Sequence, residues 1–141
     1  MEAIIHPPAG TTPPTSTAKI WTARVLAALL ILFLLVDGGG KVMRFAPYVE
    51  GTAKVGFPAS SLVPLGLVLI AATLLYAIPR TAVLGAVLLT GYFGGAVATH
   101  VRMGQPFVFP LVFGVITWAC LYLRDERLRA LLPLVRRRRE P

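Results

Sequence analysis

The sequence predicts an all-α membrane protein, an antiparallel bundle of four transmembrane helices. Hydrophobic residues make up 56% of the 141 residues and charged residues only 14%. The mean hydropathy of +0.74 is too high for a soluble domain of this length. The apolar residues gather in four blocks, each of which would extend about 25 to 28 Å as a helix, close to the ~30 Å hydrocarbon core of a bilayer.

The first apolar block covers residues 20–36. It follows a segment rich in proline and threonine, residues 1–18, which we expect to be a disordered cytoplasmic tail. We expect the helix to end at Asp37-Gly38-Gly39-Gly40, because glycine favours leaving a helix. A cleaved signal peptide is the alternative, since Lys19 and Arg24 flank the start of the run, but no Ala-x-Ala site follows it.

The other three blocks complete the predicted bundle. They cover residues 61–78, 81–99 and 107–123. Pro79-Arg80 is so short a connection that the second and third spans must be antiparallel neighbours. The membrane domain is therefore expected over residues 19–132, followed by a basic cytoplasmic tail over residues 133–141.

The connection between the first two spans, residues 41–60, allows two interpretations. Glu50 and Lys54 have the i,i+4 spacing of a helix, and Phe45 and Tyr48 could lie on the bilayer surface. A short interfacial helix and a plain loop both fit this pattern.

The distribution of basic residues predicts the orientation. One side of the membrane would carry ten basic residues and the other side four: Lys19, Arg24, Arg80 and seven arginines after Tyr122, against Lys41, Arg44, Lys54 and Arg102. The positive-inside rule then places both termini in the cytoplasm, and we expect a bacterial inner-membrane protein. The net charge of +8 is better explained by contact with an anionic lipid bilayer than with nucleic acid, because half of the basic residues follow the last span.

Small residues recur along the third block and predict a packing face. They are Ala86, Thr90, Gly91, Gly94, Gly95 and Ala98. Small residues let helix backbones approach closely, so this face should be the seam of the bundle within one chain. A homodimer interface is the alternative.

Residues 74–104, LLYAIPRTAVLGAVLLTGYFGGAVATHVRMG, resemble the DoxX-like family of small bacterial four-helix membrane proteins. The resemblance implies a four-helix bundle. The family name comes from a membrane subunit of a thiosulfate:quinone oxidoreductase, which suggests a link to redox chemistry. Many relatives carry a glutamate in the second span, where this chain has GLVLIA over residues 66–71, and this departure weakens the transfer of the family's chemistry to this chain.

Four ionisable residues are the candidates for ligand binding or proton relay. Asp37 and Lys41 close the first span, and His100 and Arg102 close the third. Because both spans run in the same direction, their ends reach the same interface and should form one polar cluster. Neutral imidazole can both donate and accept a hydrogen bond, so His100 could meet a quinone head group or exchange protons. Ion pairing and helix capping are the structural alternatives.

Other site chemistries find little support in the sequence. Cys120 has no second cysteine to pair with, and His6, the other histidine, precedes the first span. Haem held by two histidines, clustered zinc ligands and a phosphate-binding loop are therefore not expected. We expect no cofactor within the chain, no catalytic residue and no enzymatic activity of the chain on its own, although a quinone could bind.

Two functional classes remain open from the sequence. In the first, which we favour at this stage, the protein is a non-catalytic membrane subunit or scaffold for a quinone- or thiol-linked oxidoreductase. In the second, it binds a small lipophilic molecule such as a quinone, or assists its transport.

Overall fold

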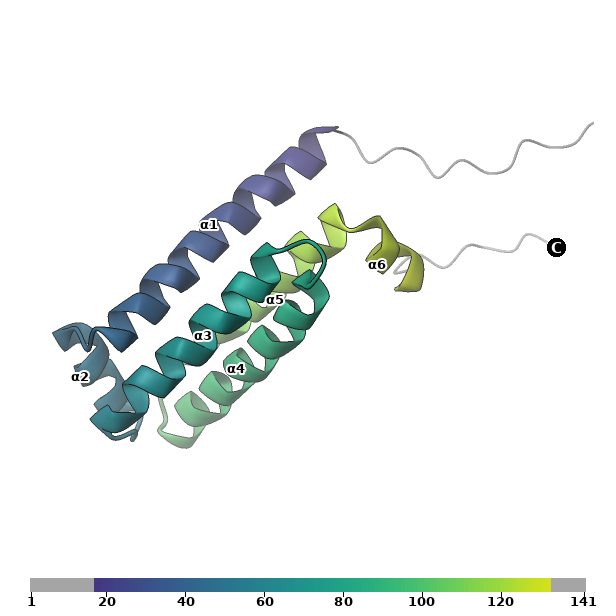
Figure 1. Cartoon of the computed structure of the whole chain (residues 1–141). Coiled ribbons are helices and arrows are strands. Elements are labelled where there is room, and N and C mark those ends of the chain that lie inside the picture. The colour runs from purple at the N-terminus through teal and green to yellow at the C-terminus, as the bar shows by residue number, and fades with distance from the viewer. Residues whose placement is uncertain (1–16, 133–141) are drawn as a thin grey trace, which may run out of the picture.

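The computed structural model describes residues 17–132 and shows an antiparallel bundle of four long helices with two short helices at its ends (Figure 1). The long helices are α1 (Thr17–Val42), α3 (Leu62–Ala77), α4 (Ala82–Arg102) and α5 (Val108–Arg124). The short elements are α2 (Ala46–Lys54), a 3-10 turn (Ala59–Ser61) and α6 (Glu126–Leu131). The all-α bundle predicted from the sequence is confirmed.

The four long helices form a closed ring in which every neighbour runs in the opposite direction. α1 packs on α3 and α5, and α4 packs on the same two helices, so α1 and α4 face each other diagonally (Figure 1). Helix α2 covers one end of the ring, which we call the α2 end. Helix α6 lies at the opposite end, which we call the α6 end. The connection of residues 41–60 is therefore largely helical. The tails predicted for residues 1–18 and 133–141 lie outside the described residues, except that Thr17 and Ala18 already belong to α1.

The surface of the bundle is apolar, as a lipid-facing surface must be. Large side chains on the outside of α1 are more than half exposed, among them Leu29 and Leu32. Three helical segments of 18 or more residues are long and apolar enough to cross a membrane, and α5, with 17 residues, is a shorter apolar helix. Exposed apolar area on this scale belongs in a bilayer rather than in water.

The glycine run at residues 38–40 does not end α1, contrary to the sequence prediction. The helix continues to Val42 because the glycines are contact points with other helices. A Cβ atom at Gly38 would lie 2.6 Å from Cγ1 of Ile70, and one at Gly66 would lie 2.7 Å from the carbonyl oxygen of Gly38. Tertiary packing of α1 on α3 therefore overrides the local preference of glycine.

The close-packed seam of the bundle is also not the predicted one. Only Ala86 of the six small residues assigned to the seam is buried; Thr90, Gly91, Gly94, Gly95 and Ala98 are exposed. A Cβ atom at any of the three glycines would meet nothing within 4 Å. The helix backbones instead approach at Gly38, Gly66 and Gly85.

Polar contacts of Tyr76, which is buried, and Arg124, which is partly buried, stabilise the bundle toward the α6 end. The hydroxyl of Tyr76 donates to the carbonyl oxygen of Thr117 at 2.9 Å and links α3 to α5. The guanidinium of Arg124 donates to the carbonyl oxygen of Tyr76 at 3.2 Å and lies 4.7 Å from the centroid of its ring. These contacts join the ends of α3 and α5 where the chain leaves the bundle.

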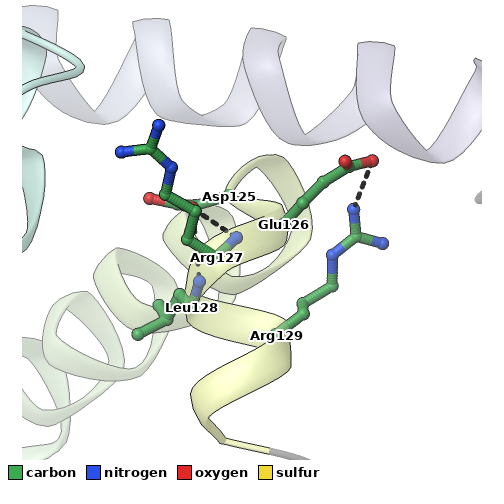
Figure 2. A network of polar contacts seen from close by, with 5 residues as sticks. All are labelled: Asp125, Glu126, Arg127, Leu128 and Arg129. Carbon is green, nitrogen blue, oxygen red and sulfur yellow. Dashed lines mark hydrogen bonds and ion pairs between the residues drawn. The ribbon is translucent and has the colours of Figure 1, made fainter.

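Helix α6 was not predicted, because six residues carry too weak a periodic signal. Asp125 caps its N-terminus by accepting from the backbone amides of Arg127 and Leu128 at 2.9 and 3.2 Å (Figure 2). Arg129 forms an ion pair with Glu126 at 3.3 Å, and the buried Leu128 joins the hydrophobic core.

Candidate functional site

The first two candidate residues, Asp37 and Lys41, form an ion pair at the α2 end. They lie one turn apart on α1, and the ammonium of Lys41 donates to a carboxylate oxygen of Asp37. The side chain of Asp37 is only 24% exposed and that of Lys41 only 17%. Each charge is thus largely removed from water and stabilised by the other. Because α1 stays helical through Gly38, Gly39 and Gly40, the i,i+4 spacing places both side chains on one face.

Lys41 also lies between two aromatic rings from two other helices. Its ammonium is 5.8 Å from the ring centroid of Tyr48 on α2 and 5.8 Å from that of Tyr92 on α4. Both distances are within the range of cation–π attraction. Lys41 therefore connects α1 both to α4, which lies diagonally across the bundle, and to the short helix α2.

These side chains line a cavity of about 530 Å³, the α2 pocket, to which five helices contribute. Its wall is apolar where it enters the bundle: Phe113 stacks on Phe33 with centroids 4.9 Å apart and packs against Phe109 at 4.7 Å. The polar lining includes Asp37, Lys41, Thr52, Tyr92, Thr99 and His100. The pocket thus combines an aromatic interior with a charged and hydrogen-bonding rim, the usual makeup of a small-molecule site.

His100 lines the same pocket from the last turns of α4. Its Nδ1 lies 2.7 Å from the carbonyl oxygen of Ala96, one turn earlier on the helix. Because a carbonyl oxygen can only accept, Nδ1 must carry a proton in this contact. In the neutral imidazole, Nε2 is then an acceptor.

Arg102 does not join the other three candidates. It is exposed and absent from the pocket lining, and its guanidinium lies on the side of Gly56, where a Cβ atom would come within 3.7 Å of it. Two residues along a helix turn its face through about 200°, which takes Arg102 away from His100. The predicted cluster of four is therefore a group of three.

Tyr92, rather than Arg102, lies with Asp37, Lys41 and His100 in the lining of the α2 pocket. Tyr92 is not among the four predicted candidates, although Tyr92, Ala96 and His100 follow one another at i,i+4 spacing and so share one side of α4. This spacing in the sequence is the pattern that indicates that Tyr92 and His100 lie on the same side of the helix.

The exposed glycines of α4 have a role in the shape of this region. Gly91 and Gly95 line the α2 pocket, while Gly94 lines a second depression. Side chains at these positions would fill the space. The small residues predicted to bring helices together instead leave room between them.

The second depression, the α5 groove, is a cavity of about 800 Å³ on the outer surface of α4 and α5 that reaches α6. Its lining is almost entirely apolar. Its polar contact is internal, since the indole nitrogen of Trp118 donates to the hydroxyl of Thr90 at 2.7 Å. The groove offers surface for lipid or another apolar helix, but no charged group for a polar ligand.

Metal ligands do not gather in the described part of the chain. Over residues 17–132 no group of three or more histidine, cysteine, aspartate or glutamate side chains lies close enough to hold a metal ion. Cys120 is a buried free thiol.

A family of known proteins matches most of the chain. The model of the DoxX-like family matches residues 25–120, which include α1 from its third turn onward, all of α2, α3 and α4, and most of α5. No curated protein and no solved structure matches the chain.

Proposed function

The chain belongs to the DoxX-like family, and from this premise we propose that it binds a small amphipathic molecule of the quinone class beside a redox partner. Family membership and the long apolar helices make it a multi-pass membrane protein. The finer function rests on one observation, the α2 pocket. It joins an aromatic interior to a polar rim at the end of a membrane bundle.

The makeup of the pocket suits a molecule with a flat ring and an apolar tail. Phe33, Phe109 and Phe113 offer ring faces for stacking or edge contacts. Lys41 and His100 supply hydrogen-bonding groups for oxygen substituents on such a ring. The cavity volume of about 530 Å³ lies within the range of small-molecule sites, roughly 300 to 1,000 Å³.

In this proposal the protein is not an enzyme by itself. It holds the ligand, and an oxidoreductase in or on the membrane carries out electron transfer. The family name, taken from a membrane subunit of a thiosulfate:quinone oxidoreductase, supports this division of roles. Asp37 and Lys41 keep the rim polar and in a fixed geometry through their ion pair.

We further propose that both termini are cytoplasmic and that the α2 pocket opens at the outer face of a bacterial inner membrane. The support is the ten-to-four distribution of basic residues. In the bundle, Arg80 and Arg124 lie at the α6 end, whereas Lys54 and Arg102 lie at the α2 end.

A non-catalytic scaffold role is the second candidate, and the α5 groove favours it. The groove and the exposed small residues of α4 leave one side of the bundle able to accept an apolar helix. A membrane partner and a second copy of the chain are both candidates for that place.

Mass spectrometry of the protein extracted under mild conditions tests both candidates. A retained amphipathic ring compound supports the binder, whereas an oxidoreductase retained without ligand supports the scaffold. The double variant Asp37→Asn/Lys41→Met removes both charges together and should lose the ligand. The control Lys54→Met changes an exposed lysine at the same end, outside the pocket lining, and should keep it.

A further inference from the structure

We propose that the α2 pocket selects its ligand through a hydroxyl group that donates a hydrogen bond to Nε2 of His100. The ligand is then a phenol or hydroquinone with an apolar tail, rather than the oxidised quinone. This inference rests on the proposed function and narrows it to one chemical form.

His100 has one ring nitrogen engaged within the protein and one left for a ligand. Its Nδ1–H is used by the carbonyl oxygen of Ala96 at 2.7 Å. Within the described residues Nε2 of His100 has no hydrogen-bond partner. It is not among the fully buried polar atoms that lack one, so it is accessible, and His100 lines the α2 pocket. The atom left for a ligand is therefore an acceptor, which requires a donor from that ligand.

The other polar groups of the rim are partly engaged with one another and with the backbone. The ammonium of Lys41 is bound to Asp37 and faces the rings of Tyr48 and Tyr92. The carboxylate of Asp37 is thereby engaged. Thr99 uses its hydroxyl proton on the carbonyl oxygen of Gly95 at 2.7 Å. The ammonium of Lys41 has further N–H groups and Tyr92 has a hydroxyl proton to donate to a ring oxygen, so the pocket offers donors from α1 and α4 beside the Nε2 acceptor of His100.

The two redox forms of a ring ligand differ in the hydrogen bonds that they can make to this rim. A hydroquinone oxygen can donate to His100 while another accepts from Lys41 or Tyr92. A quinone has only carbonyl oxygens, so one of them would face the lone pair of Nε2 without a proton between them. An unmet hydrogen bond of this kind lowers affinity on the order of tenfold.

Binding measurements on the full chain in lipid nanodiscs test the inference. The probes are a decyl-substituted benzohydroquinone kept anaerobically, its dimethyl ether and the matching benzoquinone, with binding to empty nanodiscs subtracted. We expect the hydroquinone to bind about tenfold more tightly than the other two probes. This comparison uses the unmodified protein and needs no variant to fold.

Variants then assign the preference to one residue. His100→Ala should abolish the preference for the hydroquinone, and His100→Gln should restore part of it, because its carbonyl oxygen can accept. Arg102→Gln, two residues away but outside the pocket, should leave it unchanged. If the probes bind equally to the unmodified protein, or His100→Ala keeps the preference, the inference is wrong and the proposed function stands. If no probe binds above empty nanodiscs, both are wrong.

Discussion

Gly85→Ala should destabilise the bundle, because Gly85 is where α4 approaches α3 most closely. A Cβ atom at this position would lie 2.2 Å from the backbone nitrogen of Tyr76 and 2.5 Å from its Cα. Non-bonded carbon atoms prefer separations of about 3.5 to 4.0 Å, so the two helices must move apart by more than about 1 Å. The clash is with backbone, which cannot rotate away as a side chain can.

The magnitude follows from two opposing effects. Overpacking typically costs about 1 to 3 kcal/mol, and backbone contacts this short belong at the upper end. Alanine regains up to about 1 kcal/mol of helix propensity over glycine. We therefore expect a net loss of about 2 kcal/mol in the free energy of unfolding. The displacement also pulls on Tyr76, whose hydroxyl bonds to Thr117.

Unfolding by sodium dodecyl sulfate in mixed micelles, followed by circular dichroism, measures this loss. Gly94→Ala is the matched control on the same helix, since its Cβ atom would meet nothing within 4 Å. The control should be neutral, or more stable by up to about 1 kcal/mol. Equal stability of the Gly85→Ala variant and the unmodified protein would refute the assignment of the seam.

Three further predictions concern topology and the α6 end. A reporter fused after Pro141 or inserted beside Arg80 should read cytoplasmic and one after Gly56 extracytoplasmic; the reverse pattern would overturn the proposed orientation. Asp125→Ala removes the cap of α6 and should cost about 1 kcal/mol, seen as faster hydrogen exchange at the two amides it binds, and unchanged exchange would count against the cap. Tyr76→Phe removes a buried hydrogen bond between α3 and α5 and should lower the free energy of unfolding by about 1 kcal/mol, whereas unaltered stability would show that the hydroxyl contributes nothing.

The long helices were predictable from the sequence because the membrane demands long apolar blocks. The predicted spans agree with α3, α4 and α5 within a few residues. The largest difference is at α1, which extends beyond Asp37 to Val42. Three consecutive glycines predict a helix end from local preference alone, whereas the contact between Gly38 and Gly66 depends on a helix distant in the chain.

The candidate site was predicted in part. Topology alone brings the ends of the first and third spans to one interface, and Asp37, Lys41 and His100 do line one pocket. Membership of Arg102 and Tyr92 depends on the direction of each residue around α4, which is fixed only by how that helix packs. The prediction of the helix-packing seam on α4 is wrong for the same reason. Glycine spacing reveals a face of small residues, but not whether another helix lies against it.

Photoaffinity labelling with a diazirine-bearing decyl benzohydroquinone in native membranes, followed by mapping of the labelled peptides, tests directly whether the α2 pocket binds such a ligand. We expect labelling of the α2 pocket, at residues such as Tyr48, Tyr92 and Phe113, and its suppression by excess unlabelled hydroquinone. Labelling concentrated in the α5 groove, or spread over lipid-facing residues and insensitive to competitor, would contradict this expectation.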